Sequence, residues 1–189
     1  GKQAPQCLLK LVKRGPKPFL CFESRAQETM MVAVLHDIPI TVMQPNDIIY
    51  YLPPDMAPPS ISLDLPKGKL MRTIVDRMMK ISRHLHIDAE QTGRLVFRVE
   101  NSSVSVKTYY TGLTPRFDVL SPQTDANNTA SVKVDTRRIS SLLNLDRILW
   151  DQAVLYISED EALVLHVTLS PCDAGTLTMY APVLIDETM

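Results

Sequence analysis

The sequence predicts an α+β fold in which one unit, a strand followed by a helix and three strands, occurs twice. The first copy runs from Ser60 to Tyr110 and the second from Ala130 to Leu184, separated by a polar loop at 112–129. In each copy, apolar residues three and four positions apart give way to alternating apolar and polar residues, which is the change from helical to strand periodicity. Such alternation predicts antiparallel sheets that pack their apolar face on the helices. Internal repetition without a catalytic motif indicates a scaffold.

Three strands without an intervening helix are predicted before the first copy. Residues 7–13 and 18–23 are typical of two strands joined by a turn at Gly15. Residues 31–43 form a third, and Pro39 within it lacks an N–H donor, which favours the edge of a sheet. These strands cannot bury both faces alone, and the chain lacks an initiator Met. We therefore expect them to be the end of a sheet that continues upstream.

Residues 44–59 contain five of the fourteen prolines of the chain. Segments this rich in proline form stiff, extended linkers, so the domain boundary is predicted here. The apolar residues from Ile48 to Leu52 are expected to pack against a neighbouring surface.

The first copy contains a predicted helix at 66–82 that opens at Pro66, a residue suited to a first helical turn. Strands are predicted at 84–90, 94–100 and 103–110, each with alternating apolar residues. The apolar face of the helix recurs at three- and four-residue steps and comprises Leu70, Met71, Ile74, Val75, Met78 and Ile81.

The second copy begins with a strand from Ala130 and continues with a helix capped by Asp135 or Thr136. This helix is expected to bury Ile139, Leu142 and Leu143. Strands are predicted at 152–158, 161–169 and 175–184.

A basic stripe follows the first predicted helix on the side opposite its apolar face and comprises Lys69, Arg72, Lys80 and Arg83, with Asp76 among them. Within 66–83 the only acidic residue is Asp76, against six basic ones: Lys67, Lys69, Arg72, Arg77, Lys80 and Arg83. A stripe of this kind can contact phosphates without reading bases, which gives salt-dependent, sequence-independent affinity. The alternative is a solvated helix face, which long Lys and Arg side chains often form. The second helix offers a weaker patch, Arg137 and Arg138.

Composition excludes several classes of protein. With 189 residues, 45% of them hydrophobic, and a net charge of −1, the chain is typical of a soluble globular protein and is not basic overall. No apolar run approaches the roughly 20 residues that span a bilayer, so no membrane association is expected. The three cysteines, Cys7, Cys21 and Cys172, lack metal-binding spacing and are expected to be reduced core thiols of a cytosolic or nuclear protein.

No signature of catalysis or cofactor binding is present. Phosphate-binding glycine loops and nucleophile-elbow motifs are missing. The one metal-like pattern is His84, His86 and Asp88, which alternate on one strand face, but position 89 is Ala where a metallo-hydrolase motif has a further His. Catalytic zinc needs three protein ligands. We therefore predict neither enzymatic activity nor a cofactor, and a metal-dependent hydrolase is the most distant alternative.

Several motifs in order resemble the Hus subunit family of the checkpoint sliding clamp. The resemblance spans nearly the whole chain. It is carried by His36-Asp-Ile-Pro-Ile-Thr-Val42, Ser60-Ile-Ser-Leu-Asp-Leu-Pro66, Met71-Arg-Thr-Ile-Val-Asp-Arg-Met-Met-Lys-Ile-Ser-Arg-His-Leu85, Gly93-Arg-Leu-Val-Phe-Arg-Val-Glu100 and Val104-Ser-Val-Lys-Thr-Tyr109.

The resemblance implies a PCNA-like, DNA-clamp fold and a non-catalytic nuclear subunit of a heterotrimeric ring. Such a ring encircles double-stranded DNA at damaged or stalled sites, independently of sequence, and serves checkpoint signalling, a clamp loader and repair enzymes. On this template, 1–43 would be the C-terminal strands of a first clamp domain, 44–59 the interdomain connector, and 60–184 a complete second domain. The alternative of the same fold is a protein–protein interaction module without direct DNA contact.

The resemblance also implies three sets of site residues. Those facing DNA would be Lys67, Lys69, Arg72, Lys80, Arg83, Arg137 and Arg138. Those pairing with neighbouring subunits would be Asp37, Ile38, Ile40, Val42, Val104, Val106, Thr108 and Tyr110, because unpaired strand edges favour a partner strand. Those bordering a connector pocket for partner peptides would be Ile48, Ile49 and Leu52.

Overall fold

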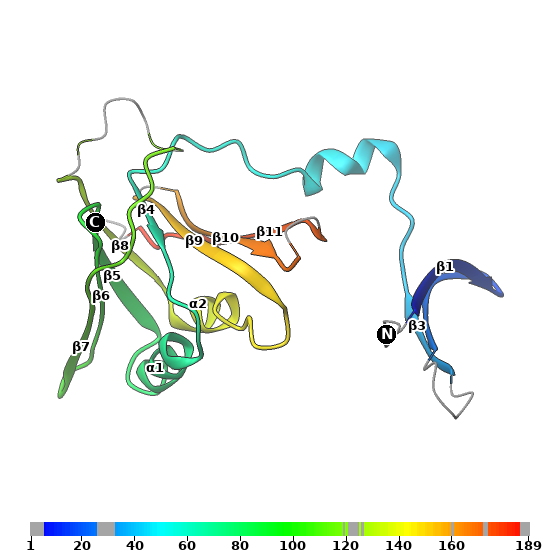
Figure 1. The fold of residues 1–189 in the computed structure, drawn as a ribbon, viewed down its shortest axis with the longest axis horizontal. Coiled ribbons are helices and arrows are strands. Elements are labelled where there is room, and N and C mark those ends of the chain that lie inside the picture. The colour runs from blue at the N-terminus through cyan, green and yellow to red at the C-terminus, as the bar shows by residue number, and fades with distance from the viewer. Residues whose placement is uncertain are drawn as a thin grey trace. The chain divides into compact units, whose positions relative to one another are not determined.

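The computed structural model describes residues 6–25, 33–118, 120, 125, 127–159, 161–171 and 174–185. The chain divides into two compact units, Gly1–Pro54 and Asp55–Met189, and Figure 1 shows the elements of each. None of the helices in the described ranges is long and apolar enough to cross a membrane.

The first unit contains an antiparallel sheet in the order β1-β2-β3. Its strands are β1 (Gln6–Arg14), β2 (Lys17–Arg25) and β3 (Ala33–Pro39). The β1–β2 turn contains Gly15 with φ of 61°, a conformation that glycine adopts without strain. β3 is an edge strand, as expected from Pro39, but it ends there, so the predicted strand at 31–43 is too long. Residues 31 and 32 lie outside the described part.

The connector contains a 3₁₀ helix, η1 (Pro45–Tyr51), instead of a purely extended linker. Pro45 presets the first turn, and the Asp47 N–H donates to the Gln44 carbonyl oxygen at 2.9 Å. Ile48, Ile49 and Leu52 are all exposed. None of the side chains of η1 is buried within its own unit, so the packing of this segment on a neighbouring surface stays a prediction.

In the second unit, the order of one strand, one helix and three strands occurs twice, as the sequence predicts. Two four-stranded antiparallel sheets are present, in the orders β7-β6-β5-β8 and β11-β10-β9-β4. The first copy comprises β4 (Ile61–Asp64), α1 (Leu70–Met78), β5 (His84–Glu90), β6 (Arg94–Glu100) and β7 (Ser105–Tyr110). The second comprises β8 (Thr129–Asp135), α2 (Thr136–Leu142), β9 (Trp150–Ser158), β10 (Ala162–Leu169) and β11 (Thr176–Pro182).

One hydrophobic core joins both sheets and both helices. The alternating side chains of β5 and β6 point into it, with Leu85, Ile87 and Phe97 almost fully buried. Met71 and Val75 of α1 and Ile139 and Leu142 of α2 belong to the same cluster. The helices therefore cover the apolar faces of the sheets, and they lie side by side (Figure 1).

The first helix is shorter than predicted at both ends. Pro66 does not open it, because the chain bends at Gly68, with φ of 122°, before α1 begins at Leu70. Leu70 was predicted to be buried but is 69% exposed, since a first-turn residue beside the bend projects outward. The helix ends at Met78, so Lys80 and Arg83 lie in the turn before β5 and not on the helix.

The free edge of β4 is closed by the segment after β7 and by one buried glutamine. Leu63 and Pro115 form an antiparallel bridge, and the Arg116 N–H donates to the Ser62 carbonyl oxygen at 2.9 Å. Gln91, in the β5–β6 turn, is fully buried and hydrogen bonds to both the N–H and the carbonyl oxygen of Ser62. These bonds tie the two sheets together at the end opposite the α1–α2 pair.

Candidate nucleic-acid interface

The basic residues of the chain are concentrated around the two helices. Residues 66–83 and 135–147 hold 9 of the 20 Lys and Arg residues but only 3 of the 21 Asp and Glu residues. The remainder of the chain is therefore acidic. Because α1 and α2 lie side by side, the two segments form one surface, which we call the helical surface. A positively charged surface of this kind suits a polyanion.

Arg72, assigned to the DNA-facing set, is instead bound into the protein. Its Nη1 donates to Asn144 Oδ1 at 2.6 Å and to Asp146 Oδ2 at 2.8 Å. Nε lies 3.7 Å from the Asp76 carboxylate, and the side chain is only 30% exposed. Asp76 in turn accepts a hydrogen bond from Ser140 of α2. Arg72 therefore ties α1 to the segment after α2, and its assignment to the DNA-facing set stays a prediction.

We expect Arg72→Met to lower the free energy of unfolding by about 1–2 kcal/mol, because charge-assisted bonds to two partners are lost from a partly screened site. The matched control is Arg77→Met, since Arg77 is exposed on the same helix and its side chain makes no hydrogen bond or ion pair within the described part of the chain. Urea denaturation of both variants measures the difference. Equal losses in the two variants would contradict this role of Arg72.

The other basic residues of the stripe differ in whether an acidic side chain lies within ion-pair distance. Lys69 Nζ lies 3.9 Å from the Asp146 carboxylate, and Arg83 Nε lies 3.1 Å from that of Asp135. Lys80 is exposed, and no ion pair is described for it. Long side chains with one weak partner remain able to reorient, so Lys69, Lys80 and Arg83 remain candidate phosphate contacts.

Asp135 also caps α2, as the sequence predicts. Its Oδ1 accepts a hydrogen bond from the Arg137 N–H at 2.8 Å, which satisfies a free donor of the helix. Burial acts to raise the pKa of the Asp135 carboxyl, but this hydrogen bond and the Arg83 guanidinium outweigh it and hold the pKa below its ordinary value. The capped state is therefore favoured above the unfolded-state pKa and weakens as the pH falls.

The second helix adds two exposed arginines, Arg137 and Arg138. Arg147, which follows α2, is also exposed and was missed because it lies outside both predicted helices. Its only sequence signal is its closeness to the end of the second helix. Lys67 was assigned to face DNA, but its ammonium group lies over the Trp150 ring, 5.4 Å from the ring centroid.

Four of the residues predicted to pair with a neighbouring subunit lie in β3 or directly after it: Asp37, Ile38, Ile40 and Val42. Asp37 forms an ion pair with Arg14 of β1 at 2.6 Å, whereas Ile38 is exposed. Ile40 and Val42 were predicted within the strand but lie after it, since the strand ends at Pro39. The Ile40 N–H still donates to the Pro18 carbonyl oxygen at 3.1 Å.

The other four belong to β7 or precede it. β7 is at the edge of its sheet, so its outer hydrogen-bonding groups face no strand of the described chain. Val106, Thr108 and Tyr110 alternate as half-buried residues along it, and burial raises the pKa of Tyr110 to about 12. Val104 was predicted within this strand but precedes it and is exposed, because the strand starts at Ser105. The pairing itself stays a prediction.

The metal-like pattern is part of an ordinary sheet face. Asp88 Oδ1 accepts a hydrogen bond from Ser131 at 2.6 Å. His86 lies between Arg98 and Lys133 in the sheet register, and burial followed by the Arg98 charge lowers its pKa. Within the described ranges, no group of three His, Cys, Asp or Glu side chains is arranged to hold a metal ion. We therefore do not propose a metal site.

The cysteines do not form one class. Cys21 is buried and Cys7 is exposed, and both are free thiols. The expectation of a core thiol is wrong for Cys7, because β1 is an edge strand with one face uncovered in its unit. Cys172 lies outside the described residues.

A sequence model of the family described as Hus1-like protein matches residues 2–185 of the chain. The chain belongs to the Hus1-like family. The resemblance inferred from the sequence motifs is thereby confirmed. In Dictyostelium discoideum, "Checkpoint protein hus1 homolog" is 31% identical over 180 residues, which cover 94% of this Hus1-like chain and 62% of that protein. In Homo sapiens, "Checkpoint protein HUS1" is 35% identical over 114 residues, which cover 58% of this chain and 40% of that protein.

A solved structure with the same fold is PCNA from Thermococcus kodakaraensis. Its TM-score is 0.65 at 18% sequence identity, and the match covers 94% of the Hus1-like chain and 65% of that chain. The predicted α+β sliding-clamp fold is therefore confirmed. The chain spans less than two thirds of the length of all three of these proteins.

Proposed function

We propose that this chain is part of a non-catalytic subunit of the heterotrimeric DNA damage checkpoint clamp. In that role its helical surface lies toward duplex DNA inside the ring. The observation that carries the proposal is the concentration of 9 of the 20 basic residues, with only 3 acidic ones, around the two helices of a sliding-clamp fold. Contacts from these side chains to phosphates are independent of base sequence, as a clamp that moves along DNA requires.

The proposed ring also gives a role to two of the sheet edges. β3 and β7 each end a sheet, and an unpaired edge can add a strand from another chain. We propose that these edges pair with the two other checkpoint clamp subunits, and that residues 44–59 connect two clamp domains. The assembled ring acts in the nucleus, is placed on damaged or stalled DNA by a clamp loader, and recruits checkpoint and repair proteins.

Duplex affinity of the ring is expected to fall steeply with salt and to depend on the free cations of the helical surface. Reversing Lys80 and Arg137 to Glu should lower the slope of log affinity against log salt by about 2, one unit for each lost phosphate contact. The measurement is a salt titration of a fluorescent duplex bound by the chain co-purified with its two partner subunits. The matched control reverses Lys13 and Lys17, which are exposed in the other unit.

The outcomes separate the parts of the proposal. If no heterotrimer co-purifies, the subunit assignment is wrong. If the ring forms but Lys80→Glu/Arg137→Glu retains DNA as tightly as the Lys13 and Lys17 control at every salt concentration, the helical surface does not face DNA.

A second candidate is a clamp-fold interaction module without direct DNA contact. It is favoured by the pairing of Arg72, Lys69 and Arg83 with protein carboxylates, which lowers the charge available to phosphates. This candidate predicts a normal ring whose duplex affinity is unaffected by the Lys80 and Arg137 reversal.

A further inference from the structure

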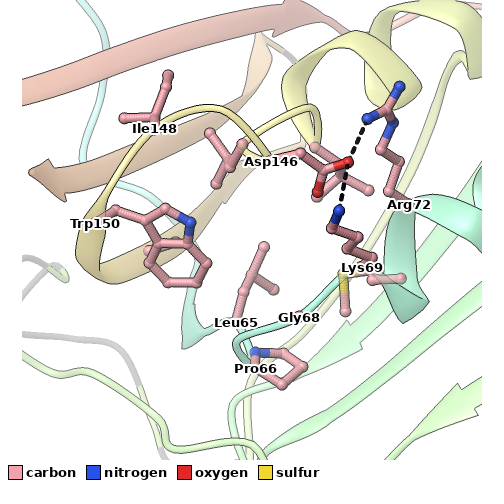
Figure 2. A pocket seen from close by; sticks show the side chains of 12 residues that line it. Leu65, Pro66, Gly68, Lys69, Arg72, Asp146, Ile148 and Trp150 are labelled. Atoms are coloured by element: carbon pink, nitrogen blue, oxygen red, sulfur yellow. Dashed lines mark hydrogen bonds and ion pairs between the residues drawn. The ribbon is translucent and has the colours of Figure 1, made fainter.

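A cavity of about 200 Å³ lies between the start of α1 and the segment that joins α2 to β9. Its walls are mainly apolar, and Leu65, Met71, Leu145, Ile148 and Trp150 contribute to them. Figure 2 shows the Trp150 ring on one side and the Asp146 carboxylate, between Lys69 and Arg72, on the other. The cavity is thus an apolar hollow with a charged wall at the edge of the helical surface.

Exposed apolar residues adjoin the lining residues in the sequence. Ile148 is partly exposed, and its neighbour Leu149 is 80% exposed. Leu70, next to the lining residues Lys69 and Met71, is exposed as well. Exposed apolar side chains near an apolar cavity favour an interaction site. The volume is well below the several hundred Å³ of a small-molecule site, so it suits one or two apolar side chains of a peptide.

The charges around the cavity indicate which residues of a bound peptide would flank its inserted apolar side chain. Among the described residues that line the cavity, Lys69 and Arg72 are cationic and only Asp146 is acidic. Lys67 is held over the Trp150 ring at 5.4 Å, where the ring attracts a cation and fixes its position. The rim is therefore net positive, which complements acidic residues on either side of an apolar anchor.

A duplex fits this cavity less well. Phosphates are reached by cations that project from a surface, whereas Arg72 is bound to Asp146 and Lys67 lies against Trp150. Aliphatic walls also offer no hydrogen-bond partners to a base edge. An apolar side chain of a peptide can fill the cavity without leaving a buried polar group unpaired.

We propose that this cavity binds a short acidic peptide segment of a partner protein, with a bulky apolar residue inserted beside Trp150 and Asp or Glu residues on the Lys67 and Lys69 rim. The inference goes beyond the clamp function and does not depend on it. Since Lys67 and Lys69 belong to the helical surface, an occupied cavity would also withdraw positive charge from DNA.

The single tryptophan of the chain provides the readout. The probes are synthetic peptides in which every pair of apolar residues is flanked on both sides by three acidic residues, with a matched set flanked by lysines. We expect the acidic set alone to bind, with Leu, Phe or Met in the anchor and a change in Trp150 fluorescence. Lys67→Glu should weaken binding about tenfold, whereas Lys13→Glu, of equal charge change, should not.

Three results would overturn the proposal. They are an acidic set without any binder, equal binding of the lysine-flanked set, and a fluorescence change produced by duplex or single-stranded DNA but by no peptide. Trp150→Phe, which keeps the apolar wall, abolishes the fluorescence signal while anisotropy of a labelled peptide still reports binding. Loss of the Lys67 effect in that assay would equally exclude this site.

Discussion

Replacing Gly93 by alanine is expected to lower the free energy of unfolding by about 3–5 kcal/mol, the largest effect of any substitution considered for this chain. Gly93 has φ of 98°, a conformation that residues with a side chain rarely adopt. A Cβ atom there would lie 2.2 Å from the Leu113 carbonyl oxygen. The backbone of Leu113 is itself held to Gly93, because the Leu113 N–H donates to the Gly93 carbonyl oxygen at 3.0 Å. The Leu113 carbonyl group therefore cannot move away from an added Cβ atom without breaking this hydrogen bond.

The chain contains a matched control for this prediction. Gly112 also has a positive φ, 73°, but nothing lies within 4 Å of a Cβ atom placed on it. Gly112→Ala should therefore lose only the backbone cost, about 1–2 kcal/mol. Urea denaturation followed by circular dichroism compares the two variants. Equal losses would show that the close approach of Gly93 to Leu113 contributes nothing.

Replacing Gln91 by methionine is expected to cost about 3 kcal/mol, because several buried polar groups lose their partner at once. Gln91 Oε1 accepts from the Ser62 N–H at 2.9 Å, and Nε2 donates to the Arg116 carbonyl oxygen at 2.7 Å. Methionine has nearly the same length and fills the same space, so the loss reports hydrogen bonding rather than a cavity. The consequence is a weakened attachment of β4 to the sheet that contains β5 and β6.

Gln152→Met is the control for that substitution. Gln152 donates one hydrogen bond, to Asp64 Oδ1 at 3.0 Å, from a half-buried position, so its loss should cost about 1 kcal/mol or less. Thermal unfolding measures both variants, and hydrogen exchange of the β4 amides locates the effect. Unchanged protection of Ser62 in Gln91→Met would contradict the role assigned to Gln91.

The sequence predicted the regular elements well where one periodicity dominates. The strands at His84–Glu90 and Arg94–Glu100 have the bounds expected from alternation alone, since every second residue enters one core. The start of α1 was wrong because Pro66 precedes the bend at Gly68, and its end was wrong because the apolar spacing continues to Ile81, past the last helical residue Met78. Spacing describes which face is buried, but it does not locate the hydrogen bond at which a helix stops.

The sequence predicted which charged residues the candidate site contains, but not which of them are held in ion pairs. Local sequence places Arg72 on the basic stripe, but its partner Asp146 lies 74 residues further along the chain. Whether a cation is free or paired depends on such distant contacts, so the composition of the helical surface could be predicted and its available charge could not.

The sequence by itself determined the repeated strand–helix–sheet order, the family and the basic character of the helical surface, because each depends on residue type and local spacing. Only the tertiary structure decided the edge closure by Gln91, the tie between Arg72 and Asp146, and the cavity beside Trp150. These features join residues that are distant in the chain, and their physical basis is long-range packing, which no local pattern records.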